Sequence, residues 1–183
     1  MKDRSDILKR KIAGYLKKGQ LARNDEHKKL EKPFLAKSRK NFSVANLLFK
    51  ISEREEMRKA LSLASDFEMY DWVIIVSYYS AYISALSALA HLGYKSKSHA
   101  ATIAVLEHNF MSKTNGKGLE AKDIHKITKA YALSEQLITK LIQTKSKRET
   151  AQYDATPSIT REMAETSLSD ADEFITKIEE VLG

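Results

Sequence analysis

The sequence WVIIVSYYSAYISALSALA, residues 72–90, holds no charged side chain and decides the fold. Its larger residues recur at steps of four and three, the spacing that keeps side chains on one face of an α-helix: Trp72, Val76, Tyr79, Ile83, Leu86 and Ala90. We expect this face to be one wall of a helical core. Small residues on a second face allow close approach by another helix: Ser77, Ser80, Ser84 and Ser87. A helix that is apolar on several sides is typical of the central member of a bundle.

A membrane span is the alternative interpretation, because the run approaches the roughly 20 residues that cross a bilayer. Four serines and three tyrosines interrupt it, Asp71 directly precedes it, and the other apolar segments are amphipathic. We therefore expect no membrane contact. The first residues lack the apolar segment of a signal peptide and cysteine is absent, which fits a cytoplasmic protein.

Positive charge is concentrated in the first 40 residues, which hold 14 Lys or Arg against 5 Asp or Glu. The remaining 143 residues sum to −2, so the basic character belongs to the N-terminal segment. Such a segment can contact nucleic acid or an acidic partner, although lysine-rich helix faces more often serve only solubility. Both interpretations stay open at the level of sequence.

The rest of the chain predicts further helices and no strand of useful length. An N-terminal helix ends before Gly19, and residues 20–32 form a loop or a short exposed helix. A long helix starts near Pro33. At the possible capping box that begins at Ser52, either a new helix starts or, as we expect, the same one continues past a bend, with Met57, Leu61 and Ala64 inward. Ser98 and Thr160 are expected N-caps of later helices. The prediction is an all-α, antiparallel bundle of about five helices over residues 33–183, with an extra N-terminal helix in a basic extension, residues 1–32.

The usual enzyme signatures are missing from this sequence. The five histidines include no pair spaced by four, and there is no His-Glu-x-x-His motif, so we expect no metal. Glycine-rich phosphate loops and the Gly-x-Ser-x-Gly nucleophile motif are also absent. We therefore expect no cofactor.

Three residues around the apolar run are candidates for ligand binding. His99 follows a capping serine at a helix start, where it either contacts a phosphate or packs in the first turn, the more common role. Tyr78 and Tyr79 are adjacent, so one should enter the core while the other lines an interface or a groove. Asp71 is either a ligand or only a carboxylate at a helix start.

The segment Arg148-Glu-Thr-Ala-Gln-Tyr153 carries the remaining candidates. An arginine near a helix end can hold a phosphodiester and stabilise charge that develops during its cleavage. RNA cleavage also needs a general acid or base, and tyrosine, with an ordinary pKa near 10, serves poorly beside histidine. Arg148 and Tyr153 are thus candidates for ligand binding and, less directly, for catalysis.

Four features together resemble the HEPN (higher eukaryotes and prokaryotes nucleotide-binding) superfamily, particularly its small archaeal members. They are the run Tyr70–Tyr82, the turn Gly93–His99, the segment Arg148–Tyr153 and the acidic final helix. The resemblance extends from about Phe34 to Leu182. It implies a bundle of about five helices, commonly a homodimer, often encoded beside a minimal nucleotidyltransferase as a toxin and antitoxin pair.

Many members of that family are ribonucleases in which an arginine is followed, after four to six residues, by a histidine at the dimer cleft. Arg148 matches the arginine, but Tyr153 stands at the first expected histidine position, followed by Asp154 and Ala155. Tyr153 also resembles the tyrosine that partner transferases nucleotidylate in some members. The resemblance therefore implies a non-catalytic module that binds RNA, a nucleotide or a nucleotidyltransferase. The alternatives are a divergent metal-independent ribonuclease, with Arg148 on the phosphate and Tyr153 or His99 assisting, and a purely structural homodimer.

Overall fold

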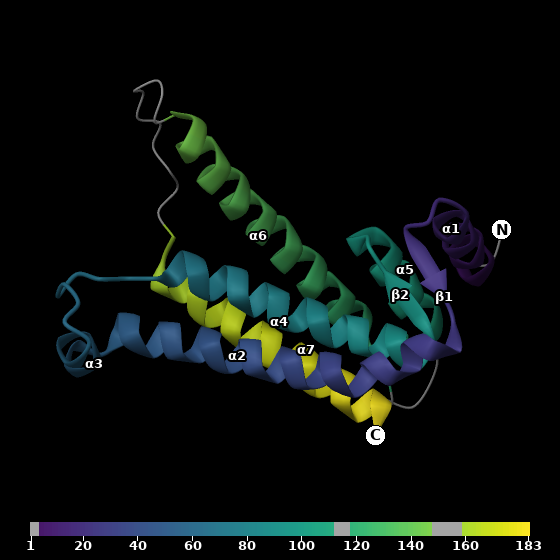
Figure 1. Ribbon diagram of the computed structural model, residues 1–183, viewed down its shortest axis with the longest axis horizontal. Helices are drawn as coiled ribbons and strands as arrows, with labels where there is room; N and C mark the ends of the chain where they lie inside the picture. The colour runs from purple at the N-terminus through teal and green to yellow at the C-terminus, as the bar shows by residue number, and fades with distance from the viewer. Residues whose placement is uncertain (1–3, 112–117, 148–158) are drawn as a thin grey trace.

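The computed structural model describes residues 4–111, 118–147 and 159–183. These ranges contain seven α-helices and a small antiparallel pair of strands (Figure 1). The helices are α1 (Arg4–Lys17), α2 (Glu31–Glu53), α3 (Glu55–Ala60), α4 (Tyr70–His91), α5 (His99–Asn109), α6 (Ala121–Lys147) and α7 (Arg161–Leu182). The strands are β1 (Leu21–Arg23) and β2 (Tyr94–Ser96), and η1 (Asp25–Leu30) is a 3₁₀ helix.

The predicted all-α bundle with an added N-terminal helix is confirmed, and α4 is its central member. Helices α2 and α7 run along α4, while α5 and the first half of α6 cover its other sides (Figure 1). By length and composition alone α4 could cross a membrane, but 78% of its most apolar window is buried inside the protein. The core helix of a bundle is buried in this way, so the structure does not support the membrane alternative.

Ser80 and Ser87, two of the four serines of α4, form a seam with α2, which approaches closely on this face as the sequence predicts. Ser80 donates to the carbonyl of Ser38 at 2.7 Å, and Ser38 donates back to the carbonyl of Ser80 at 2.9 Å. Ser87 donates to the carbonyl of Glu31 at 2.8 Å. Each of these α4 serines is fully buried, so the two backbones approach at side chains too small to separate them.

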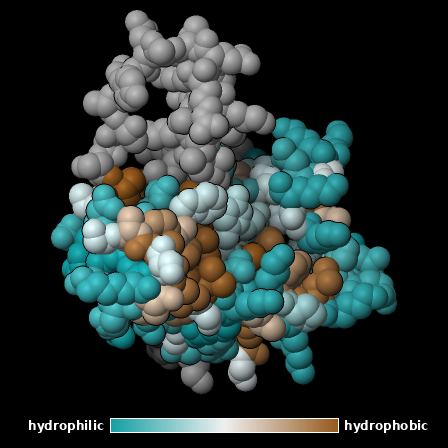
Figure 2. Space-filling view, turned by 60° about the vertical axis from the view of Figure 1, so that its left-hand side comes forward, coloured by the Kyte–Doolittle hydropathy of each residue, from teal (hydrophilic) through white to brown (hydrophobic). Residues whose placement is uncertain are grey.

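The face of α4 that we expected to be a core wall is buried only in part: Ile83 and Ala90 lie in the core, but other residues of the face are exposed. Trp72 is 44% exposed and Tyr79 is 40% exposed, while Val76 and Leu86 on the same face are only partly buried. The expectation was wrong for Trp72 and Tyr79, because the face of small residues packs more closely against other helices and turns these larger residues outward. Exposed apolar side chains also occur on α2, at Val44 and Leu47. Figure 2, which brings the α3 end forward, shows brown hydrophobic atoms among teal hydrophilic ones.

The N-terminal segment is a docked part of the fold. Leu8 and Ile12 of α1 and Leu21 of β1 are buried in the same hydrophobic cluster as α4 and α5. Gly19, at φ 66°, ends α1 and lets the chain turn into β1. The expected boundary at residue 33 falls inside α2, where Pro33 lies in the first turn.

Strands β1 and β2 were not predicted, and they correct the expectation of a chain without strands. Three residues each are too short to show an alternating pattern. The pairing depends on Gly93, at φ 78°, where a Cβ would meet the carbonyl oxygen of Asn24 at 3.1 Å. The amide of Asn24 donates to the carbonyl of Gly93 at 2.9 Å.

The segment after α2 also differs from the expectation of one long, bent helix. Arg54 is extended, so α2 ends and the short α3 begins one residue later. Ser52 does not cap α3, because its hydroxyl accepts from the amide of Met69 at 2.9 Å and donates to the carbonyl of Leu48 at 3.0 Å. Leu61, expected to point inward, is 54% exposed.

Two polar clusters fasten α7 to the bundle. Arg39 of α2 donates to Asp172 and to Glu179, each at 2.8 Å. At the other end, Glu53 accepts from Arg161 at 2.6 Å and from the hydroxyl of Tyr70 at 2.7 Å. The hydrogen bond from Arg161, the largest cause, holds the pKa of Glu53 below its usual value.

Candidate functional site: a tyrosine cage around His99

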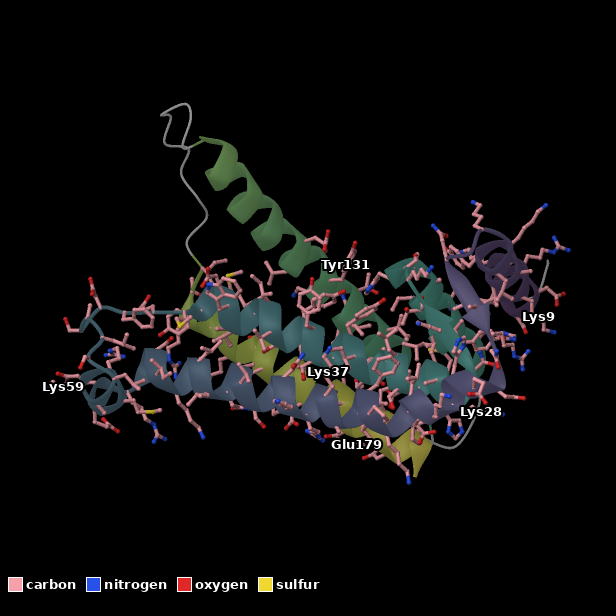
Figure 3. All side chains as sticks on the ribbon, viewed as in Figure 1. Lys9, Lys28, Lys37, Lys59, Tyr131 and Glu179 are labelled. Atoms are coloured by element: carbon pink, nitrogen blue, oxygen red, sulfur yellow. The ribbon has the colours of Figure 1, made fainter. Side chains whose placement is uncertain are left out.

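A cluster of four aromatic rings forms where α4, α5 and α6 meet. The ring of His99 stacks on Tyr131 with centroids 4.0 Å apart and planes 12° apart. The ring of Tyr82 stacks on His99, with centroids 5.7 Å apart, and on Tyr78, with centroids 5.8 Å apart. Tyr78 lies 6.2 Å from His99 and 5.7 Å from Tyr131. We call Tyr78, Tyr82, His99 and Tyr131 the tyrosine cage; Figure 3 labels Tyr131 on the α6 side.

Local sequence places each ring of the cage. Tyr78 and Tyr82 are four residues apart, so both lie on one face of α4. His99 is the first residue of α5, which Ser98 caps by accepting from the amide of Ala101, as predicted. Tyr78 is 4% exposed and the adjacent Tyr79 is 40% exposed, so the expected division of this pair between core and surface is confirmed.

His99 is uncharged at neutral pH. Burial lowers the pKa of its imidazole from 6.5 to about 4, and the N-terminus of α5 disfavours the cation in the same sense. Both ring nitrogens are buried, and neither has a hydrogen-bond partner within the described residues. A neutral imidazole offers one donor and one acceptor, and within the described residues both of these groups of His99 are without a partner.

Tyr78 and Tyr82 are held in their neutral form as well. Burial raises the pKa of Tyr78 far above its ordinary value, and the neighbouring Tyr82 adds to that rise. Burial also raises the pKa of Tyr82, whose hydroxyl lies 3.3 Å from the hydroxyl of Thr102. Burial therefore keeps Tyr78, Tyr82 and His99 uncharged in an aromatic cluster that also holds the two unpartnered nitrogens of His99.

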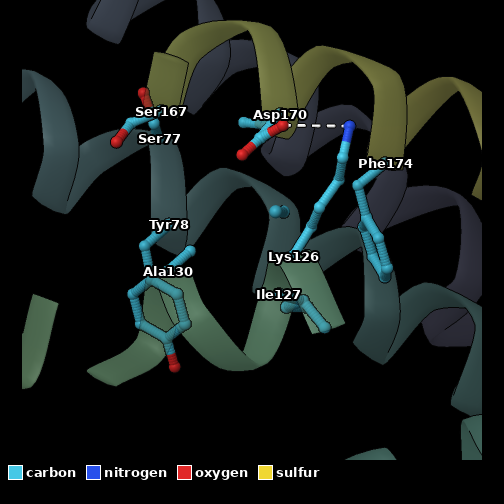
Figure 4. Close-up of a pocket in the computed structure, with 10 residues that line it drawn as sticks. Ser77, Tyr78, Lys126, Ile127, Ala130, Ser167, Asp170 and Phe174 are labelled. Carbon is cyan, nitrogen blue, oxygen red and sulfur yellow. Dashed lines mark ion pairs between the residues drawn. The ribbon is translucent and has the colours of Figure 1, made fainter. Parts of the chain in front are cut away.

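A small cavity adjoins the cage beneath Tyr78 (Figure 4). Its volume is about 10 Å³, close to the room that one water needs. Ser77 lines it with a buried hydroxyl that has no partner within the described ranges, and Lys126 pairs with Asp170 at 2.9 Å on the far side. A planar ligand would reach His99 only if Tyr131, which is partly exposed, rotated away.

The structure unites two of the five site residues predicted from sequence. Tyr78 and His99 belong to the cage. Asp71 lies seven residues before Tyr78, about 10 Å away along α4. It is in the first turn of the helix, where its carboxylate accepts a hydrogen bond from the amide of Trp72 at 2.8 Å. Arg148 and Tyr153 lie outside the described residues.

Sequence reasoning missed Tyr82 and Tyr131 as site residues. Tyr82 carried a usable signal, because a tyrosine four residues after Tyr78 on a helix shares its face. Tyr131 was expected only as an inward residue of α6, and nothing in sequence connects it with His99, 32 residues earlier. Only the packing of α6 against α5 and α4 brings these rings together.

Comparison with known proteins gives one family match. The family model described as HEPN domain matches residues 45–181. That range starts within α2 and includes the whole cage, and it leaves α1, β1 and η1 outside. A comparison with curated proteins finds no match.

Proposed function

Because the chain belongs to the HEPN family, we propose that it is a non-catalytic, homodimeric module that binds RNA or a nucleotide in the cytoplasm. One observation carries this proposal: the imidazole of His99, neutral and without a hydrogen-bond partner in the described residues, stands among three tyrosines. Unpaired bases are recognised by stacking on aromatic rings and by hydrogen bonds to their edges. The tyrosine cage supplies both kinds of group once Tyr131 rotates.

The same histidine argues against ribonuclease activity. A general acid or base works best when its pKa lies near the operating pH, and that of His99 is about 4. At neutral pH the ring is not the imidazolium, the form whose acidic proton would protonate a leaving oxygen, and with this pKa it is also a weak base. The sequence also places Tyr153, not histidine, after Arg148. Binding without cleavage is therefore the function that these residues support best.

The exposed apolar face of α4 supports the homodimer. Trp72 and Tyr79 leave aromatic surface open to solvent on the helix that forms the core, and Val44 and Leu47 of α2 add aliphatic surface. Large aromatic residues are enriched at the centres of protein interfaces. Burying this face between two copies removes it from water and joins two bundles through their central helix.

A nucleotidyltransferase is the partner that we propose, with the pair acting as a toxin and antitoxin. This proposal rests on the family and on Tyr153, which is a candidate acceptor for a transferred nucleotide. Incubating the purified chain with the product of an adjacent nucleotidyltransferase gene and ATP should add one nucleotide to Tyr153, measured by intact-mass spectrometry. A Tyr153→Phe variant should stay unmodified. Modification that persists in that variant would remove Tyr153 from the proposal.

Ligand binding is tested by titrating AMP and a five-nucleotide RNA into the full chain and measuring heat. His99→Phe keeps a stacking ring and deletes both nitrogens, so we expect affinity to fall at least tenfold. His125→Phe, on the exposed side of α6, is the matched control and should bind as the wild type does. Equal affinities of all three proteins would contradict a site at His99.

Cleavage is tested by incubating the chain with total RNA in the presence of a chelator. We expect intact RNA with the wild type and with Arg148→Ala. Cleavage that needs Arg148 but no divalent metal would overturn the non-catalytic proposal and favour the ribonuclease alternative. Absence of both binding and cleavage would leave a structural homodimer.

A further inference from the structure

Helix α6 is held in the hydrophobic core by its first two turns. Ile124 and Ile127 are 7% and 2% exposed and belong to the same buried cluster as α4 and α5. Among the α6 side chains that the structure describes after Ile127, none is buried. The rest of the helix leans away from α4 in Figure 1. Tyr131, the ring that covers His99, therefore lies one turn beyond the last buried anchor of its helix.

Lys126 is the charged link between α6 and α7. Its ammonium group pairs with Asp170 at 2.9 Å, as Figure 4 shows, and with Glu173 at 2.6 Å. The hydrogen bond to Glu173, the largest cause, raises the pKa of Lys126, so the amine stays charged. Among the residues that the structure describes, no other ion pair joins α6 to another helix. Lys126 lies five residues before Tyr131, so it holds α6 close to the point where the cage is covered.

The packing beside Lys126 is incomplete. Lys126, Ile127 and Tyr78 line the cavity of about 10 Å³ where α6 meets α4 and α7. Side chains leave this space unfilled, so the atoms that line it lose dispersion contacts between the helices. The two ion pairs of Lys126 therefore contribute a larger share of the attraction that holds this part of α6 in place.

We propose that Lys126 is a positioning residue for the tyrosine cage: its ion pairs with α7 keep Tyr131 stacked on His99 and so restrict the access of a planar ligand. The inference rests on the proposed function, because the ligand is the base that the cage binds. Binding then requires α6 to shift and Tyr131 to leave His99, and the free energy of that opening lowers the apparent affinity. Weakening the ion pairs should therefore raise the affinity.

Salt gives this role a distinctive sign. The side chains of Asp170 and Glu173 are 30% and 41% exposed, so dissolved ions screen their attraction to Lys126. Salt should therefore raise the affinity for an uncharged ligand. A strand held through its phosphates shows the opposite dependence, because salt weakens its binding.

The experiment titrates adenosine, an uncharged nucleoside, into the full chain at 50 and 500 mM NaCl and measures heat. Lys126→Met removes the charge and keeps an apolar stem, so we expect its affinity at the lower salt to exceed that of the wild type about threefold to tenfold. The wild type should gain affinity with salt, whereas this variant should not. Lys126→Arg keeps the charge and both carboxylate partners and should bind as the wild type does.

Lys122→Met is the matched control for the loss of charge. Lys122 lies on the same helix and pairs with Glu120, just before α6, at 3.3 Å. The control removes one positive charge, as Lys126→Met does, and should leave both the affinity and its salt dependence unchanged. Equal affinities of Lys126→Met and the wild type, or a wild-type affinity that falls with salt, would overturn the proposal.

A second measurement needs no ligand. NMR titration of the His99 imidazole reports how well the ring is shielded from water. We expect its pKa to rise from about 4 toward 6.5 in Lys126→Met and to stay at about 4 in Lys122→Met. Absence of adenosine binding in every protein would contradict a base-binding cage, and the pKa would still decide whether Lys126 positions Tyr131. An unchanged pKa in Lys126→Met would overturn that role.

Discussion

His99 makes stability depend on pH in a defined direction. Its pKa is about 4 in the folded chain and 6.5 ordinarily, so the unfolded chain takes up a proton first as pH falls. The stability that this residue confers is complete above pH 6.5 and is lost on acidification toward pH 4. His99→Phe keeps an aromatic ring without a titrating group, and it should flatten the loss between pH 7 and pH 5.

Urea unfolding of both proteins at pH 7 and pH 5 measures this difference. The wild type should lose more free energy of unfolding than the variant over that interval. His125→Phe is again the control, because His125 is exposed, and it should follow the wild type. Parallel losses in the wild type and His99→Phe would show that the cage does not exclude the proton.

Ser77 and Ser84 are both fully buried on α4, yet only one of them has a hydrogen bond. Ser84 donates to the carbonyl of Ala81 at 2.7 Å, whereas the hydroxyl of Ser77 has no partner among the described residues. Ser77→Ala should therefore change the free energy of unfolding by less than about 0.5 kcal/mol, and Ser84→Ala should cost about 1 kcal/mol. Chemical denaturation compares them, and a larger loss for Ser77→Ala would show that its hydroxyl is satisfied in solution.

Between elements, the contact of α2 with α4 depends on the small size of Ser80. Ser80→Ala removes one of two reciprocal hydrogen bonds with Ser38 and should cost about 1 kcal/mol. Ser80→Val also forces two methyl groups into a closed seam, so it should cost about 1–3 kcal/mol more. Thermal and urea unfolding test both variants. Equal stabilities of the two would mean that the seam has spare room.

Arg39 joins α2 to α7 through charge, with partners of which Asp172 is exposed and Glu179 is partly buried. Arg39→Met keeps the apolar stem and removes the hydrogen bonds to Asp172 and Glu179, and we expect a loss of about 1 kcal/mol. The loss should shrink in 1 M NaCl, which screens exposed charges. Lys59→Met, which breaks an exposed pair within α3, is the control and should cost less than about 0.5 kcal/mol. A loss at Arg39 that is independent of salt would point to packing.

At the scale of the whole molecule, the exposed face of α4 predicts the oligomeric state. Replacing Trp72 and Tyr79 by serine should convert the proposed dimer to a monomer without unfolding it, because both side chains are already 40% exposed or more. Sedimentation velocity measures the change. Ile7→Ser, at a site 44% exposed on α1, is the control and should stay dimeric. A monomeric wild type at micromolar concentration would contradict this interface.

The sequence determined the helical class, the central helix and the HEPN family. Spacing along the chain shows which side chains share a helix face, and capping at Ser98 and Thr160 followed from neighbouring residues alone. The same spacing puts Ala164, Leu168 and Ile175 on one face of α7, and all three are buried. These properties depend on residues within one or two helical turns, which the sequence displays directly.

Tertiary structure alone decided which face of α4 lies inside, which rings meet at His99, and that β1 pairs with β2. Trp72 and Tyr79 were expected in the core, but both are exposed. Hydrophobic spacing does not show which of two apolar faces of one helix is buried more deeply, whereas in the folded protein the face of smaller residues allows closer contact between helices. The stacking of His99 on Tyr131 and the pairing of Leu21 with Ser96 join residues distant in the chain. Such contacts arise from how helices assemble, and local sequence carries no record of that assembly.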